Sequence, residues 1–358
     1  MGLKIKINNK IRLNRMASDL AVSSDAAADA AADAAADAAA DAADDVVVAL
    51  PRTHSIDSSA QTTPPFCRTH LGITRFQYQE LKFLNGRYEL TEKVLGEGVY
   101  GKVVAAIDHG NHRQMVAIKI QNMSGRSQSM LDVKREAMLG MNIPTHPNVC
   151  KTIDWFQLGK MFYIAMEIVE GVSFQDYMLN NKLTAANLPT FLELLRQMAL
   201  AIEHVHRSGY VHRDIKPTNF VVVCKDKQIN VKLTDFGFSS PKRKIDQSTK
   251  GTPIFLSPEV AKKDGIDESC DIWALGVLIL LHLTGEELPV YLEGVKDCER
   301  AFEIIAGLTE NPFPAKLTEN ENHMFALIAK VARQCLEIDK LKRPSAAEIA
   351  AYLQIIPI

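Results

Sequence analysis

The stretch VHRDIKPTNF, residues 211–220, decides how this sequence is interpreted. It places Asp214, Lys216, Thr218 and Asn219 between a helix-like segment and the apolar, strand-like FVVV. Any one of these polar side chains would suit a solvated turn, because such residues are common in loops. An acid, a base and an amide at the entrance of one strand instead indicate a reaction site, provided that the rest of the chain supplies complementary groups.

A glycine-rich segment lies upstream of this stretch. GEGVYGKV places Gly96, Gly98 and Gly101 between two strand-like runs, with Val103 after them. Glycine permits tight turns and a close approach of the backbone to phosphates. Alone, this spacing is as typical of a plain hairpin turn as of a nucleotide loop. It is not a Walker loop, since no Gly-Lys-Ser/Thr follows, and a strand rather than a helix comes next, unlike in the dinucleotide fingerprint.

Two charged residues follow the glycines. Lys119 ends VAIK in a strand-like run, and Glu136 lies in the helix-like VKREAML. Strand alternation alone would let Lys119 point into solvent, and Glu136 alone is an ordinary surface charge. Placed after a glycine loop, Lys119 is positioned to reach phosphates, and Glu136 to pair with it.

Four further motifs complete the pattern. They are LTDFGFSS with Asp235, GTPIFLSPE at residues 251–259, DIWALG at residues 271–276, and KRPSA with Arg343. Each is a common short peptide, but all of them in this order and at these separations do not arise by chance. Over residues 86–356 the chain therefore resembles the eukaryotic protein-kinase family.

The resemblance implies an α+β, bilobal fold with ATP held between the lobes. The runs YELTEKVL, GKVVAAID, MVAIKI and FYIAMEIV, with the helix-like MLDVKREAMLGM, suit a small β-rich N-lobe over residues 86–168. Helical periodicity over residues 188–206 suits a larger α-helical C-lobe over residues 169–356. Residues 1–85 contain DAAA repeats and a Ser-, Thr- and Pro-rich segment, which predict a low-complexity, disordered tail and linker.

The family's roles carry over to matching positions. The glycines would cover the ATP phosphates, and Lys119 would contact the α- and β-phosphates and pair with Glu136. Met166 resembles the gatekeeper, and residues 167–169 the hinge that binds adenine through its backbone. Asp235 and Asn219 would each bind Mg²⁺. The implied cofactor-binding residues are Gly96, Gly98, Gly101, Val103, Ala117, Lys119, Glu136, Met166, Glu167, Ile168 and Val169.

Within the opening stretch, Asp214 resembles the catalytic base, and Lys216 the residue that steadies the transferred phosphoryl group; Asn219 completes the implied catalytic set. The implied reaction moves the γ-phosphate of ATP to a protein substrate, which needs mainly positioning and charge neutralisation. Lys216 and Thr252 together resemble the serine/threonine branch, because tyrosine-specific members typically carry arginine at the position of Lys216. Dual specificity is the remaining alternative.

Arg213, directly before Asp214, indicates regulation. Family members with this arginine often need phosphorylation of the activation loop by an upstream kinase, because a phosphate can order the loop against arginine. The candidates are Ser239, Ser240, Ser248 and Thr249, of which the last two are favoured by their position. The alternative is a solvated basic loop without a switch.

Three histidines and one ion pair carry structural expectations. His212 is expected to pack near Phe236. His204 and His206 are read as helix-face residues, because no further ligand is spaced for zinc. The resemblance also implies a buried ion pair between Glu259 and Arg343, although Ser-Pro-Glu stands where the family usually has Ala-Pro-Glu.

Bulk properties limit the partners. The chain has 41 basic and 43 acidic residues, without the basic excess typical of nucleic-acid-binding proteins. Six cysteines without a C-x-x-C pair suit reduced thiols in a cytoplasmic or nuclear protein. No signal peptide is apparent, and the apolar segment at residues 272–283 is too short for a membrane span, so a buried helix is expected.

Two alternatives share the implied fold. A pseudokinase would use it as a binding scaffold, but such proteins usually lack the strand lysine, the base or a metal ligand, and here Lys119, Asp214, Asn219 and Asp235 are all present. A kinase acting on a small molecule is disfavoured by GTPIFLSPE, because this element shapes a peptide-binding surface in the family.

Overall fold

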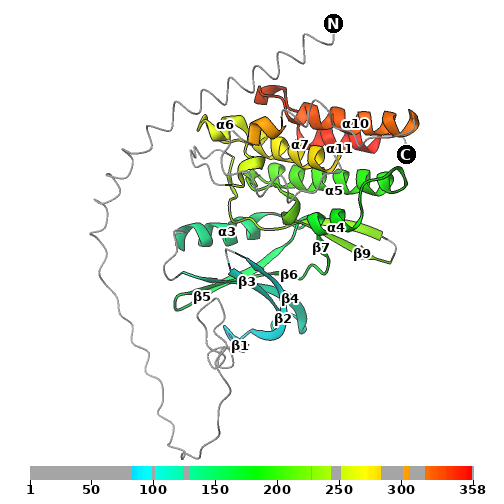
Figure 1. Cartoon of the computed structure of the whole chain (residues 1–358). Coiled ribbons are helices and arrows are strands. Elements are labelled where there is room, and N and C mark those ends of the chain that lie inside the picture. The colour runs from blue at the N-terminus through cyan, green and yellow to red at the C-terminus, as the bar shows by residue number, and fades with distance from the viewer. Residues whose placement is uncertain are drawn as a thin grey trace, which may run out of the picture.

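The computed structural model describes residues 83–98, 101–123, 130–226, 228–242, 251–283, 301–305 and 319–356. The tail predicted over residues 1–85 lies almost entirely outside the described residues, as do Ser248 and Thr249. Along the described chain a strand-rich region precedes a helix-rich one, as the α+β class predicts. In Figure 1 the strand-rich region lies below α3 (Met130–Asn142), and most of the other helices lie above α3.

The strand-rich region is a six-stranded sheet in the order β1-β2-β3-β4-β6-β5, with every neighbouring pair antiparallel. Apolar side chains of one face form a core in which the ring of Phe156 stacks on those of Tyr88 and Tyr163, with centroids 5.6 and 5.0 Å apart. The strands are β1 (Phe83–Leu84), β2 (Tyr88–Gly98), β3 (Gly101–Asp108), β4 (Gln114–Asn122), β5 (Thr152–Leu158) and β6 (Met161–Glu167).

Helix α3 packs on the opposite face of this sheet. Successive residues of a strand point to opposite faces. Accordingly, Tyr163 belongs to the first core, whereas Phe162 and Ile164 contact Val133 and Ala137 of α3. This packing brings the buried face of α3 against β5 and β6.

Four of the six strands match predicted runs, and β3 coincides with GKVVAAID. The predicted YELTEKVL extends through Gly98 in β2. β5 was not predicted, because the acidic Asp154 interrupts its apolar character. The register shifts between Thr152 and Asp154, and the Asp154 carboxylate accepts a hydrogen bond of 3.1 Å from the Tyr88 hydroxyl.

The helix-rich region contains two small sheets, in the orders β10-β9-β7 and β11-β8. Its elements, with η for 3-10 helices, are β7 (Val172–Ser173), α4 (Phe174–Asn180), η3 (Ala185–Asn187), α5 (Leu188–Arg207), β8 (Tyr210–Val211), η4 (Pro217–Asn219), β9 (Phe220–Lys225), β10 (Gln228–Leu233), β11 (Ser240–Pro241), η5 (Pro253–Phe255), α6 (Pro258–Ala261), α7 (Ser269–Leu283), α10 (Glu319–Cys335), η6 (Lys340–Lys342) and α11 (Ala346–Gln354).

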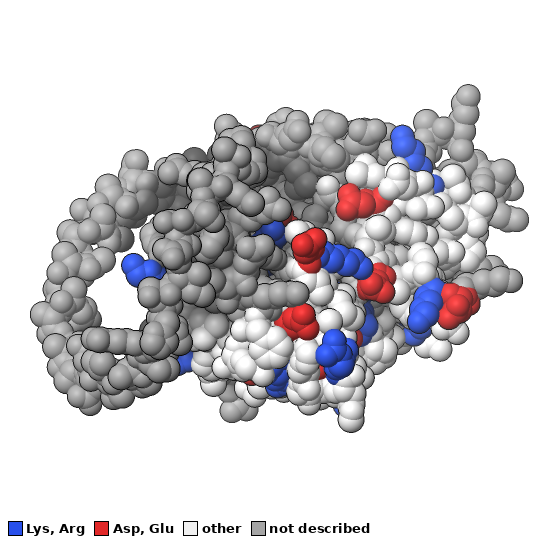
Figure 2. Space-filling view, turned by 90° about the horizontal axis from the view of Figure 1, so that it is seen from below, with Lys and Arg blue, Asp and Glu red and all other residues white. Residues whose placement is uncertain are grey.

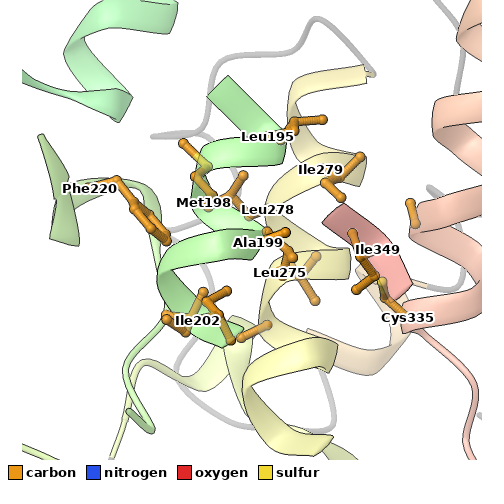
Figure 3. Packing of buried hydrophobic residues seen from close by; sticks show 14 of the residues in the cluster. Leu195, Met198, Ala199, Ile202, Phe220, Leu275, Leu278, Ile279, Cys335 and Ile349 are labelled. Atoms are coloured by element: carbon orange, nitrogen blue, oxygen red, sulfur yellow. The ribbon is translucent and has the colours of Figure 1, made fainter. Parts of the chain in front are cut away.

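The core of this region forms between α5, α7, α10 and α11. α5 presents an apolar stripe at the spacing that predicted it, and the stripe packs on α7, with Cys335 and Ile349 beyond (Figure 3). All of α7 after Ser269 is buried, which confirms the buried helix expected at residues 272–283. No helix within the described part of the chain is long and apolar enough to cross a membrane.

Charged residues are mixed on the surface. On the face drawn in Figure 2, the described Lys and Arg side chains alternate with Asp and Glu among uncharged residues. This mixture agrees with the near balance of the two signs in the composition.

The apolar helix α7 also buries a histidine, and the stability of the protein is expected to depend on it. Burial lowers the pKa of His282 to about 4, although its Nδ1 lies 2.7 Å from the carbonyl oxygen of Leu278. In the unfolded chain the imidazole of His282 binds a proton near pH 6.5. The stabilisation that the neutral, buried His282 gives the folded state is therefore complete above that pH and is lost as the pH falls toward 4. We expect protonation of His282 in the unfolded chain to lower the free energy of unfolding by about 1.3 kcal/mol as the pH falls from 7.5 to 5.5.

The His282→Leu variant should lack this part of the pH dependence. Urea unfolding at pH 7.5 and 5.5 gives, for each protein, the change in the free energy of unfolding between the two pH values. In the difference between the two proteins the effects of the other titrating groups cancel. Equal pH dependence in the two proteins would show that His282 is not kept neutral by its burial.

Candidate active site

A cavity of about 370 Å³ opens between the six-stranded sheet and the segments after α5. Most of the sequence-predicted cofactor residues contribute to its wall together with residues that were not predicted. The described lining consists of Gly96, Glu97, Gly101, Val103, Lys119, Glu136, Cys150, Thr152, Ile164, Met166, Thr218, Asn219, Thr234, Asp235 and Phe236. Segments far apart in sequence therefore meet at one hollow.

Lys119 makes the central ion-pair contacts of this cavity. Its Nζ donates to Glu136 Oε1 at 2.6 Å and to Asp235 Oδ1 at 2.9 Å. Lys119 is buried, so the interpretation of a solvent-facing strand lysine is wrong. Strand β4 places it inward, and α3 and the segment after β10 supply the two carboxylates.

Lys119 and Asp235 stabilise each other's charge, whereas burial raises the pKa of Glu136 despite its contact with Lys119. Burial alone would lower the pKa of Lys119, but Asp235 and Glu136 raise it well above its usual value. Burial would raise the pKa of Asp235, but Lys119 lowers it to about 2. Lys119 is therefore a cation and Asp235 an anion at neutral pH.

Two residues of the site have an uncommon backbone conformation. Asp235 and Arg213 have φ angles of 64° and 69°, in the left-handed region that residues other than glycine seldom occupy. Such conformations cluster at functional sites, where the surrounding structure holds them. Beside them the ring of Phe236 packs edge-on against that of His212, with centroids 5.3 Å apart. This contact confirms the prediction that His212 packs near Phe236.

The Asp214 carboxylate is held on one side only. Its Oδ2 accepts from Lys216 Nζ at 2.7 Å and from Asn219 Nδ2 at 2.9 Å. Its Oδ1 is buried and has no hydrogen-bond partner among the described residues. Lys216 Nζ also lies 3.4 Å from Thr252 Oγ1. Asp214, Lys216 and Asn219, the catalytic set implied within VHRDIKPTNF, thus form one connected group, and Thr218 lies in the cavity lining.

The remaining predicted cofactor residues lie beside the cavity and not in its described lining. Gly98 pairs with Gly101 where β2 meets β3, and buried Ala117 pairs with Met166 between β4 and β6. Glu167 ends β6, and Ile168 and Val169 follow it. The side chain of Glu167 is occupied elsewhere, since Oε1 accepts from the Lys151 amide at 2.9 Å and from Lys232 Nζ at 2.8 Å.

Asp271 anchors the segment that carries Asp214, a function that sequence reasoning missed. From α7 its carboxylate accepts the backbone amides of His212 at 2.8 Å and Arg213 at 2.7 Å, and it lies 2.9 Å from Nε2 of His206. Burial would raise the pKa of Asp271, but its contact with His206 lowers it below the usual value. His206 is therefore a buried partner of Asp271 and not merely a helix-face residue.

The other expectations have mixed outcomes. Arg343 binds Glu259 through two hydrogen bonds of 2.7 Å each, which confirms the predicted ion pair. Ser239 and Ser240 are buried, so phosphorylation of either would require the local structure to open. The described residues contain no group of three or more His, Cys, Asp and Glu side chains suited to a metal ion.

Comparison with known proteins agrees with this geometry. The model of the protein kinase domain family matches residues 88–353. The chain is 30% identical over 261 residues to serine/threonine-protein kinase MST20 of Pyricularia oryzae, and 30% identical over 271 residues to serine/threonine-protein kinase PAK 1 of Mus musculus. The alignments cover 72% and 74% of this chain but 27% and 46% of those proteins. The chain therefore belongs to the protein kinase family, as its motifs predicted.

Proposed function

We propose that the protein transfers the γ-phosphate of ATP to serine and threonine hydroxyls of protein substrates. The observation that carries this proposal is the intact charged set around one cavity: Lys119 paired with Glu136 and Asp235, and Asp214 held by Lys216 and Asn219. The relatives named above are serine/threonine-protein kinases, which supports the same activity here.

In this proposal ATP lies in the cavity between a small β-rich N-lobe, residues 86–168, and a helical C-lobe, residues 169–356. Adenine hydrogen-bonds to the backbone of residues 167–169, beside Met166, Val103 and Ala117. The glycines at positions 96, 98 and 101 cover the phosphates, and Lys119 neutralises part of their charge. The tail is the part of residues 1–85 that precedes β1, because Phe83 and Leu84 pair with β2 and Leu84 belongs to the core of the sheet.

The residues present suit Mg²⁺, which prefers hard oxygen ligands. Asp235 is ionised and its carboxylate faces the cavity. Asn219 donates its amide nitrogen to the backbone oxygen and the carboxylate of Asp214, so its side-chain oxygen is available to a cation. We assign the two metal positions to Asp235 and Asn219. When bound, Mg²⁺ would neutralise the charge on the phosphate oxygens.

Asp214 acts as the base in this mechanism. Its Oδ2 is fixed by Lys216 and Asn219, while the unpartnered Oδ1 is left to accept the proton of a substrate hydroxyl. Lys216 Nζ, which reaches both Asp214 and Thr252, steadies the transferred group and links the base to the GTPIFLSPE segment. This link supports a serine/threonine preference.

The protein's partners are accordingly Ser/Thr-containing proteins and an upstream activating kinase. We place the protein in the cytoplasm or the nucleus, supported by the free state of the four cysteines that the structure describes, Cys150, Cys224, Cys270 and Cys335.

The experiment is a transfer assay with Mg²⁺, labelled ATP and a mixture of Ser, Thr and Tyr peptides. Label on serine and threonine is the expected result. No label, even after treatment with an upstream kinase, would support the pseudokinase alternative, and label mainly on tyrosine would contradict the serine/threonine assignment.

The Lys119→Met variant should lose this label and bind ATP about 10- to 100-fold more weakly. The reason is that a charge-assisted hydrogen bond contributes about 1.5–3 kcal/mol. Removing the cation also leaves Glu136 and Asp235 without their shared partner. Equilibrium binding of a fluorescent ATP analogue measures the affinity. Unchanged affinity in the variant would remove Lys119 from the phosphate site.

A further inference from the structure

Helix α3 touches the sheet at a residue that has no side chain. Gly140 lies four residues after Glu136, on the same face of the helix, and is buried. A methyl group added at Gly140 would overlap Oγ1 of Thr152 and lie 2.9 Å from its Cβ. Real Cβ atoms do not approach a neighbour so closely, so only glycine fits against Thr152 here.

The backbone conformation does not explain this glycine. Gly140 is absent from the described glycines with positive φ, so it does not end the helix in a left-handed turn, and α3 continues to Asn142. Glycine weakens a helix interior relative to alanine. A glycine kept inside a helix therefore calls for a packing reason, which the contact with Thr152 supplies.

Thr152 connects this contact to the cavity. It is the first residue of β5, it pairs with Met166 of β6, and it contributes to the cavity wall. One turn earlier on α3, Ala137 packs on Phe162 and Ile164 with another small side chain. Small residues on successive turns let the helix lie close to the sheet.

We propose that Gly140 is a positioning residue: by admitting α3 to close contact with Thr152, it sets the 2.6 Å contact between Glu136 and Lys119. Its effect passes through Glu136, and Gly140 itself touches neither nucleotide nor substrate. The inference rests on the proposed function, because the Lys119–Glu136 pair matters for phosphotransfer to the extent that Lys119 holds the ATP phosphates.

The Gly140→Ala variant is expected to lose kcat/KM for phosphotransfer. The added methyl pushes α3 away from β5 and draws Glu136 away from Lys119. Displacements of about 1 Å at catalytic groups can cost on the order of 100-fold, so we expect a 10- to 100-fold loss. The loss should appear in kcat and in ATP affinity, with the KM for peptide unchanged. Because alanine favours the helix, the thermal midpoint need not fall in parallel.

A second variant distinguishes positioning from general damage. Thr152→Gly removes both atoms that the new methyl would meet, but it also changes the cavity wall. The double variant Gly140→Ala, Thr152→Gly is therefore compared with Thr152→Gly alone, and its kcat/KM should nearly equal that of this single variant. Met141→Ala, at an exposed position of the same helix, is the matched control and should keep the kcat/KM of the unaltered protein.

The outcomes separate this inference from the proposed function. If the unaltered protein is active and Gly140→Ala stays within twofold of it, or if Gly140→Ala lowers kcat/KM as much in the Thr152→Gly protein as in the unaltered one, the inference is wrong and the function stands. If the unaltered protein transfers no phosphate, the function fails, and crystal structures decide the inference. A Lys119–Glu136 separation that widens in Gly140→Ala would support it, and an unchanged separation would overturn it.

Discussion

Replacing Asp214 by asparagine is expected to lower kcat about 10²- to 10⁴-fold, the range that a positioned general base contributes. Asparagine has nearly the same shape and keeps an oxygen that can accept from Lys216 or Asn219, so the surrounding segment should hold. It cannot take a proton from the substrate hydroxyl. ATP affinity should therefore change little, because Asp214 lies outside the described lining of the cavity. Steady-state kinetics and nucleotide binding, measured on the same preparation, test both parts.

Asp226→Asn is a suitable control for this variant. Asp226 is exposed and has a φ of 51°, a conformation that asparagine tolerates well, so kcat should not change. If Asp214→Asn retained more than a tenth of the activity, the assignment of Asp214 as the base would be wrong. A fall in ATP affinity as large as the fall in kcat would instead assign Asp214 to nucleotide binding.

Replacing Arg343 by leucine is expected to lower the free energy of unfolding by about 3–5 kcal/mol. The guanidinium binds both oxygens of Glu259 at 2.7 Å, donates to the carbonyl oxygens of Glu337 and Ser269 at 2.8 and 2.9 Å, and lies 5.1 Å from the ring centroid of Trp273. Leucine would leave the Glu259 carboxylate buried without its partner, which is the costly consequence of breaking a buried pair. Chemical denaturation measures the loss.

Two comparisons make this prediction specific. The pair between Lys340 and Asp267 is partly exposed, so Lys340→Ala should cost below about 1 kcal/mol. The double variant Arg343→Leu, Glu259→Leu should be more stable than Arg343→Leu alone, because it no longer buries an unpaired charge. A double variant less stable than the single one would show that Glu259 is stabilised by other contacts.

The sequence was most informative where chemistry is local. The polar group within residues 211–220 is compact along the chain, so it was noticed at once, and motifs elsewhere in the chain then supported its interpretation as a reaction site. The apolar periodicity of α5 and the continuous apolar run of α7 predicted their burial for the same reason, because both signals lie within one element.

Contacts between distant elements were harder to predict. Strand alternation left two orientations for Lys119, and only the position of α3 decides between them. A single aspartate in an apolar helix carries no sign that it accepts two backbone amides, so Asp271 and its partner His206 were missed. Gly140 is likewise explained only by its neighbour in space, Thr152.

The anchoring of residues 212 and 213 by Asp271 has a consequence for tolerance to mutation. Helix α7 fills the largest apolar core and, through one carboxylate, also holds the backbone just before Asp214. A shift of α7 caused by a substitution deep in that core, for example at Leu275, would therefore be transmitted to Asp214. In a saturation scan scored by phosphotransfer, α7 would be as intolerant as the cavity itself, although none of its side chains belongs to the described cavity wall.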